Sequence, residues 1–134
     1  MPVAVLDASA LVALIFKEKG HEAVGKVLAA GAVTTPTGLA EALDIARRHN
    51  HGRTAEQLAD DLGELGLEME PLDLEDGLEM ARLLALAAAK KEQQPNIGGL
   101  SLGDAACLAV AARLDLPAVF SDGTWEVLDL PVKI

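Results

Sequence analysis

The stretch PVAVLDASALVALIF, residues 2–16, decides the fold class of this chain. Its first part, PVAVLD, is an apolar run with β-branched valines that ends in an acid, which is typical of a buried strand. Its second part, DASALVALIF, repeats apolar residues at helical spacing. The sequence therefore predicts a strand that leads directly into a helix, with Asp7 at the junction.

The rest of the chain continues this alternation of helical segments and short apolar strands. Helical spacing of apolar residues recurs over residues 21–31, 37–50, 54–66, 74–91 and 101–115. Strand patterns lie at residues 32–35, 67–72, 117–122 and 131–134. Helix starts are indicated by Thr37 as an N-cap and by two capping-box pairs, Thr54 with Gln57 and Ser101 with Asp104.

Strands that alternate with helices predict a parallel sheet, because parallel strands are joined by crossover connections. Strands that are apolar throughout require burial on both faces of that sheet. The expected fold class is therefore α/β, with helices on both sides of a central parallel sheet. Ligands of such folds bind beyond the carboxyl ends of the strands, so Asp7 and Asp122, which each follow a predicted strand, are the first candidates for chemistry.

Length and charge limit the possible classes of protein. A chain of 134 residues, 51% of them hydrophobic, suits one domain and is too short for two of ordinary size, so we expect a single domain over residues 1–134. The formal net charge of -10 argues against a protein that coats duplex nucleic acid. Ten of the acids lie between residues 56 and 79 without a Lys or Arg, which is typical of a solvated helix face.

Cysteine content and the N-terminus indicate a cytoplasmic protein. Cys107 is the only cysteine, which excludes an internal disulfide and a thiolate zinc cluster, and we expect it in the core. The N-terminus has no basic region, and only nine uncharged residues, 8–16, precede Lys17, against the ~20 of a membrane span. We therefore expect no membrane association.

Four acids stand in apolar or small-residue surroundings: Asp7 in VLDASAL, Glu41 in GLAEALDIA, Asp104 in LSLGDAACLAVAA and Asp122 in AVFSDGTW. Each also has a structural explanation. Asp7 fits an N-cap, Asp122 a turn and Glu41 an exposed helix position. Asp104 fits a capping box with Ser101. Taken singly, these acids do not distinguish a site from ordinary helix chemistry.

If the four carboxylates converge at one edge of the sheet, their charges must be offset. Two carboxylates ~5 Å apart repel by about 3 kcal/mol at an effective dielectric constant near 20. The pairs among four such groups would exceed the stability of a typical domain, so either some carboxyls are protonated or a divalent cation is bound. An all-oxygen set without His or Cys favours Mg²⁺ or Mn²⁺ over zinc, and such a cation supports chemistry on phosphate groups.

The order of these motifs resembles that of the PIN domain ribonucleases, and within them of the VapC-type toxins of bacterial and archaeal toxin-antitoxin pairs. VLDASALVALIF resembles the opening strand of the family with its first Asp, and GLAEAL resembles its Glu-bearing helix. LSLGDAACLAVAARLDLP resembles the third acidic motif, and AVFSDGTW the final strand with the last Asp. The resemblance covers nearly the whole chain, with PVKI, residues 131–134, as a last strand.

The resemblance implies a three-layer α/β/α sandwich and an endoribonuclease that depends on Mg²⁺ or Mn²⁺. Carried over position by position, it implies that Asp7, Glu41, Asp104 and Asp122 bind the metal and carry catalysis. It also implies an RNA substrate, a toxin homodimer, and a small antitoxin that wraps the domain with an apolar helix and puts a basic side chain into the acidic pocket. The apolar segments 11–16 and 83–89 are candidates for antitoxin surface and equally for buried core.

The chain departs from the family pattern at two positions. Phe120 stands where Thr or Ser is common, two residues before the last Asp, with a hydroxyl at Ser121 instead. Ala40 stands before the Glu, where a polar residue is frequent. Because such partners orient metal ligands, these changes predict weaker metal binding or activity with the fold retained. A catalytically weak PIN-like binding module is therefore an alternative function.

Arg47, Arg48 and Arg53 form the densest basic cluster, and they follow Glu41 closely in the sequence. One interpretation is a helix end whose basic residues complement the helix dipole. The other is a patch that grips RNA phosphates beside the acids. The sequence leaves both open.

Two other site chemistries also place an Asp after the first strand. A phospho-acceptor signalling domain gathers acids around Mg²⁺, but it requires a Lys after a late strand, and AVFSDGTW supplies none. A phosphatase that forms an aspartyl phosphate requires a second Asp two residues after the first, where this chain has Ser9. A nucleophilic serine at Ser9 or Ser101 would lack an identifiable base.

Overall fold

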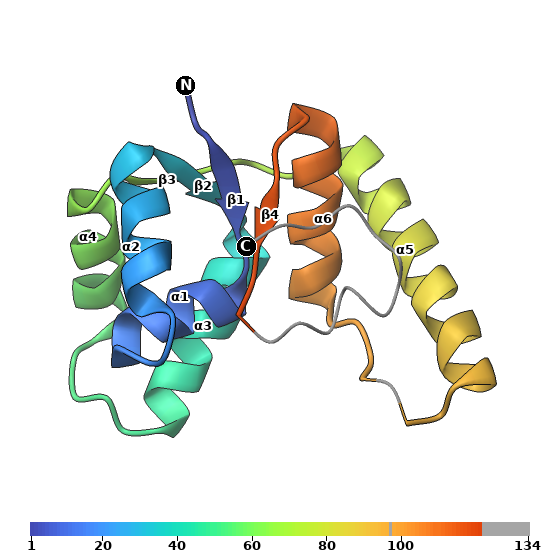
Figure 1. The fold of residues 1–134 in the computed structure, drawn as a ribbon, viewed down its shortest axis with the longest axis horizontal. Coiled ribbons are helices and arrows are strands. Elements are labelled where there is room, and N and C mark those ends of the chain that lie inside the picture. Colours follow the sequence, from blue (N-terminus) through green and yellow to red (C-terminus); the bar gives the residue numbers. More distant parts are fainter. Residues whose placement is uncertain (97, 122–134) are drawn as a thin grey trace.

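A four-stranded parallel sheet forms the centre of the part of the chain that the computed structural model describes, residues 1–96 and 98–121 (Figure 1). The strand order is β3-β2-β1-β4. The strands are β1 Ala4–Leu6, β2 Ala32–Thr34, β3 Leu67–Met69 and β4 Ala118–Val119. Val5 of β1 lies opposite Val33 on one side and Ala118 on the other, and the pairings are parallel. The predicted parallel sheet is confirmed.

Helices cover both faces of this sheet (Figure 1). They are α1 Ala8–Phe16, α2 His21–Ala30, α3 Pro36–Arg48, α4 Ala55–Glu64, α5 Leu74–Gln93 and α6 Leu102–Leu114. α1 and α2 pack together on one face, and α5 and α6 pack together on the other. The expected α/β/α sandwich is therefore confirmed. In the described part of the chain, every helix is too short or too polar to span a lipid bilayer.

Alternation along β1 supplies both halves of the core. Leu6 is fully buried and packs with Leu11 of α1 on one face of the sheet. Val5 is fully buried on the other face, where it packs with Cys107 and Val110 of α6. Successive side chains of a strand point to opposite faces, so one short strand contributes to two helical layers. The prediction that Cys107 belongs to the core is confirmed.

Helix starts follow the side-chain hydrogen bonds that the sequence indicates. Both predicted capping boxes are present, Thr54 with Gln57 before α4 and Ser101 with Asp104 before α6. In each, the hydroxyl accepts a backbone N–H and the third helical residue accepts the N–H of the cap. Gly31 ends α2 with a φ of 107°, a conformation that glycine adopts without steric cost.

The prediction of Thr37 as the N-cap of α3 is wrong. Thr35 is the cap, because its Oγ1 accepts the backbone N–H of Gly38 at 3.0 Å. Pro36 occupies the first helical position, where a missing N–H costs nothing since that group has no partner inside the helix. The strand therefore ends at Thr34, and the helix begins one residue before the predicted cap.

Two predicted features lie outside the described residues. They are the last strand, residues 131–134, and the acid Asp122. Of the strand predicted over residues 117–122, the structure describes Ala118–Val119 as β4, with Phe120 buried directly after it.

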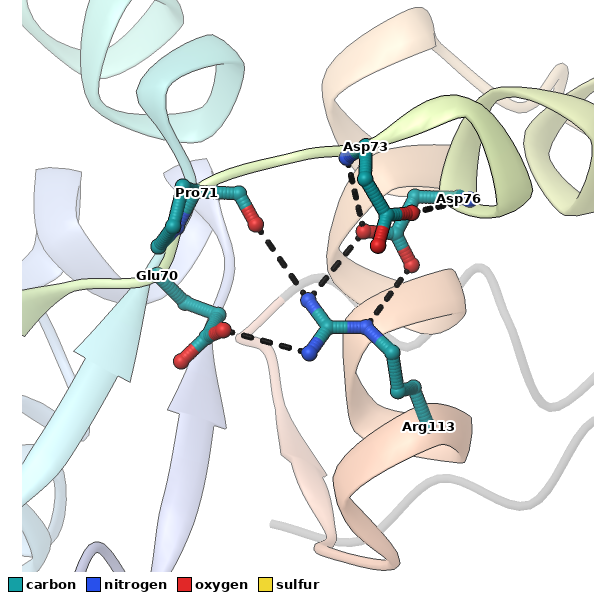
Figure 2. Close-up of polar contacts among 5 residues, drawn as sticks. All are labelled: Glu70, Pro71, Asp73, Asp76 and Arg113. Carbon is teal, nitrogen blue, oxygen red and sulfur yellow. Dashed lines mark hydrogen bonds and ion pairs between the residues drawn. The ribbon is translucent and has the colours of Figure 1, made fainter.

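A polar cluster around Arg113 joins α6 to the start of α5 and to the segment that follows β3 (Figure 2). The guanidinium of Arg113 donates from Nε to Asp76 Oδ1 at 3.0 Å and from Nη2 to Asp76 Oδ2 at 3.1 Å. It also donates to Glu70 Oε2 at 3.1 Å and to the carbonyl oxygen of Pro71 at 3.3 Å. Asp76 is 2% exposed, so this cluster fixes how α5 packs on α6 at the end remote from Asp104.

Candidate active site

A cavity of about 380 Å³ lies where β1 and β4 end and where α3 and α6 approach each other. Its lining brings together two of the predicted acids, Glu41 and Asp104, with several hydroxyl groups. The lining residues are Ala8, Ser9, Val12, Glu18, Glu41, Ile45, Ser101, Asp104 and Ser121. This is the carboxyl edge of the sheet, where an α/β fold binds its ligands.

Asp7 lies beneath this cavity at the junction of β1 and α1, where it is fully buried. As the N-cap of α1 it accepts the backbone N–H of Ala10 on Oδ1 at 2.8 Å. The hydroxyl of Ser9 lies 2.8 Å from Oδ1 and 2.9 Å from Oδ2 of the same carboxyl group. The predicted N-cap is confirmed, and burial of its side chain places a carboxyl group in the interior beside the cavity.

Glu41 reaches the cavity from α3 and lies against the start of α6. A Cβ atom added at Gly103 would lie 3.2 Å from Oε1 of Glu41 and 3.3 Å from its Cδ and Oε2. With a larger residue than glycine at this second position of α6, the carboxyl group of Glu41 would have to shift away from the start of the helix. A negative charge is stabilised at a helix N-terminus, where backbone N–H groups point outward.

Asp104 is the third residue of α6 and belongs to its capping box with Ser101. Burial raises the pKa of the Cys107 thiol well above its ordinary value, and the negative charges of Asp7 and Asp104 raise it further. Both acids therefore interact electrostatically with the same thiol, although they are far apart in the sequence. The structure brings Asp7, Glu41 and Asp104 to the same end of the sheet.

Carboxylate and hydroxyl oxygens at this edge are the donors that Mg²⁺ and Mn²⁺ prefer. Within residues 1–96 and 98–121, no three His, Cys, Asp or Glu side chains are placed to hold a metal ion together. Asp122, the fourth predicted ligand, is outside this range. The donor chemistry thus fits the expected cation, and the metal site of four acids stays a prediction.

Two of the three predicted RNA-binding arginines lie around a different cavity, of about 510 Å³, between the end of α3 and the start of α4. Arg47 and Arg53 line it, and neither lines the acidic cavity. Arg47 and Arg48 both donate to Asp44, at 2.7 Å and 3.1 Å, and the hydrogen bond from Arg47 lowers the pKa of that carboxyl. These exposed pairs leave the guanidinium groups within reach of solvent.

Two features of the acidic cavity were not predicted. Glu18, just after α1, adds a further acid to the lining of the cavity. It lies in a loop and belongs to no sequence motif, so no pattern in the sequence indicates its presence there. The sequence predicts no hydrogen-bonding role for Ser9, whereas its hydroxyl donates to Asp7 and accepts the backbone N–H of Ser121. The spacing of Asp7 and Ser9 within one helical turn was the available signal.

Comparison with known proteins identifies the family of this chain. The sequence matches the family model of the PIN domain over residues 4–129. The chain belongs to the PIN domain family. No curated protein matches the sequence of this PIN domain.

Two solved structures resemble this PIN domain over almost their whole length. One is VapC20 of Mycobacterium tuberculosis, described as a toxin that cleaves the sarcin-ricin loop, with a TM-score of 0.63, 17% identity and 95% of each chain covered. The other is VapBC2 of Rickettsia felis bound to a DNA fragment from its promoter, with a TM-score of 0.66 and 17% identity. That match covers 98% of this PIN domain and 97% of the other chain. At this identity the likeness concerns the fold.

Proposed function

We propose that this PIN domain is an endoribonuclease that depends on Mg²⁺ or Mn²⁺ and acts in the cytoplasm as the toxin of a type II toxin-antitoxin pair. The observation that carries the proposal is the gathering of Asp7, Glu41 and Asp104 at the carboxyl edge of the sheet, beside a cavity open to solvent. Asp122 is the fourth acid of the proposed site. VapC20, which shares the fold, is described as a toxin that cleaves the sarcin-ricin loop.

The acids would hold the cation through carboxylate oxygens. When bound, such a cation polarises a phosphoryl oxygen, lowers the pKa of a coordinated water and stabilises the leaving oxygen. No protein nucleophile is then required, in agreement with hydroxyl groups of Ser9 and Ser101 that are engaged in hydrogen bonds to backbone or to Asp7. The chain's own residues hold and orient the carboxylates at the edge of the cavity.

Arg47, Arg48 and Arg53 are proposed to contact RNA phosphates. Arg48 follows Glu41 by seven residues on α3, so the two side chains lie on the same helix face ~10 Å apart along the axis. Arg47 and Arg48, which both donate to Asp44, would exchange this acceptor for phosphate oxygens.

A cognate antitoxin and a second copy of the chain are the proposed protein partners. VapBC2 bound to a DNA fragment from its promoter shares the fold, and the VapC-type family that the sequence resembles pairs each toxin with an antitoxin. Of the apolar segments considered as docking surface, Leu11 is fully buried, and Leu83 and Ala87 are largely buried. The large apolar side chains that α5 exposes are Leu74, Leu78 and Leu86. The outward face of α5 is therefore the better candidate for a partner than segment 11–16.

A catalytically weak binding module is the second candidate function. Phe120 is 1% exposed and packs into the core with Val5 and Cys107, so the position that commonly carries a hydroxyl in the family is apolar here. Loss of a partner that orients a metal ligand typically lowers metal affinity 10- to 100-fold. If the wild type cleaves RNA no faster than a variant that lacks the Asp7 carboxylate, that result would support this alternative.

The deciding experiment compares RNA cleavage by the wild type and by Asp7→Asn, with Mg²⁺, with Mn²⁺ and with a chelator. Asn is as good an N-cap as Asp, so α1 should still form and the melting temperature should change little. Loss of a ligand should lower the cleavage rate by at least ~100-fold, because the cation is undercoordinated. Asp60→Asn, an exposed acid on α4, makes the same charge change and should cleave normally. Cleavage that persists in chelator, or in the Asp7 variant, would exclude the proposed mechanism.

A further inference from the structure

We infer that Ser9 is a positioning residue of the acidic site, which fixes the Asp7 carboxylate and the end of β4 through a single hydroxyl group. This inference rests on the proposed function, since positioning matters to activity only if Asp7 is a metal ligand. The evidence is a chain of hydrogen bonds that joins α1 to the residue after Phe120. Its members are Asp7, Ser9 and Ser121.

The first step concerns the pairing of β1 with β4. The backbone N–H of Val5 donates to Pro117 O at 2.9 Å, and that of Asp7 donates to Val119 O at 3.1 Å. These bonds advance by two residues on each strand, so a continued ladder would next have Ser121 N–H donate to Asp7 O. That carbonyl instead accepts Leu11 N–H at 3.1 Å, as the first hydrogen bond of α1. The carbonyl oxygen of Asp7 therefore serves the helix, and Ser121 N–H finds another acceptor.

Ser9 supplies the replacement acceptor. Its Oγ accepts the backbone N–H of Ser121 at 2.9 Å. A second bond ties the same two residues, because Ser121 Oγ donates to the Ser9 carbonyl oxygen at 3.2 Å. The ladder between the two segments thus continues past the point where β1 becomes a helix, through the side chain of Ser9.

The direction of the protons follows from the chemistry of the groups. A backbone N–H can only donate, so Ser9 Oγ accepts from Ser121. The one proton of the hydroxyl then points to the Asp7 carboxylate, which can only accept. The result is a directed chain from Ser121 N–H through Ser9 O–H to Asp7, and such chains strengthen each member. Ser9 is half-buried beside the cavity, so this chain is partly shielded from water.

This arrangement gives Ser9 a role that Phe120 cannot provide. The family commonly places a hydroxyl at that position, and in this chain the side chain there is buried among apolar residues. Ser9 orients Asp7 from the helix side and holds Ser121, which immediately precedes Asp122 in the sequence. The hydroxyl therefore links the first predicted ligand to the chain segment that leads to the last.

The test measures Mn²⁺ affinity by electron paramagnetic resonance and, in metal-free protein, hydrogen exchange of the Ser121 amide. Ser9→Ala should weaken Mn²⁺ binding about 10-fold, the effect typical of a lost partner of a metal ligand, and should expose the Ser121 amide to exchange. Ser9→Thr keeps a hydroxyl and should restore much of both. Ser121→Ala keeps the backbone N–H, so its effect on Mn²⁺ affinity should be smaller than that of Ser9→Ala.

Thr54→Ala is the matched control, because it removes a hydroxyl hydrogen bond at the start of another helix, remote from the acids. It should lower the melting temperature and leave Mn²⁺ affinity unchanged. If the wild type binds Mn²⁺ and Ser9→Ala binds it equally well, the inference is wrong. If the wild type binds no Mn²⁺, the proposed function fails instead, and the inferred link is then decided by amide exchange: unchanged protection of Ser121 in Ser9→Ala would overturn it.

Discussion

Loss of the Arg113 guanidinium should destabilise the fold by about 3 kcal/mol at pH 7, the lower end of the 3–5 kcal/mol typical of a broken buried ion pair. The Asp76 carboxylate that Arg113→Met leaves behind is 2% exposed and loses two hydrogen bonds, of 3.0 and 3.1 Å. The lower end applies for two reasons. A third of the Arg113 side chain is exposed, at 33%, and the backbone N–H of Asp73 still donates to Asp76 at 3.1 Å. Met retains most of the apolar stem.

Chemical unfolding of four proteins measures this effect: the wild type, Arg113→Met, Asp76→Asn and the double variant. A neutral amide is easier to bury without a partner than a carboxylate is. Asp76→Asn should therefore cost stability in the wild type and cost nothing, or restore some stability, in Arg113→Met. The coupling free energy between the two changes should reach ~1–3 kcal/mol, as for residues in one hydrogen-bond network.

The pH dependence follows from the pKa of Asp76. Hydrogen bonds from Arg113 hold that pKa below its ordinary value of 3.8, so this stabilisation is present above pH 3.8 and is lost as the pH falls below it. In Arg113→Met, burial of Asp76 without the guanidinium raises the pKa, so the variant loses stability as the pH rises through the new value. The difference between wild type and variant should therefore grow between pH 4 and 7.

Arg82→Met is the control, since it breaks an exposed pair with Glu79 on the same helix. Exposed pairs contribute little, so its cost should stay within about 0.5 kcal/mol at any pH in this range. The reasoning is refuted if the costs of Arg113→Met and Asp76→Asn simply add, or if the cost of Arg113→Met is the same at pH 4 and pH 7.

Two further predictions concern the acids and the basic cluster. Gly103→Ala places a methyl group 3.2 Å from Glu41 Oε1, so Mn²⁺ affinity should fall several-fold in a binding titration. Gly63→Ala is the control, because this glycine also lies on a helix but faces open space, and the change should stabilise the protein by ~0.5–1 kcal/mol. Equal Mn²⁺ affinity in the two variants would contradict the proposed place of Glu41. Replacing Arg47 and Arg48 with Ala should reduce the salt dependence of single-stranded RNA binding by up to ~1.4 in logarithmic slope, at ~0.7 per phosphate contact. Filter binding over a range of salt measures the slope, and an unchanged value would assign both residues to the helix end alone.

Local chemistry made much of the fold predictable from the sequence. Hydrogen bonds between residues two or three apart form the strand-to-helix junction at Asp7 and the capping boxes of α4 and α6. Both partners of each bond therefore appear together in a short stretch of sequence. The alternation of short apolar strands with helices was sufficient for the parallel sheet. Thr35 was missed as a cap because two threonines flank Pro36, and only the backbone shows which hydroxyl reaches Gly38.

Long-range contacts were decided by the tertiary structure. The sequence singled out Glu41 and Asp104, but only the packing of α3 on α6 shows that Glu41 lies against Gly103. The bonds between Ser9 and Ser121 span 112 residues and exist because β4 pairs with β1. Which strands become neighbours depends on burial summed over the whole chain, and no local pattern contains that sum. The residue types of the site were therefore set by the sequence, and their hydrogen-bond partners by the order of strands in the sheet.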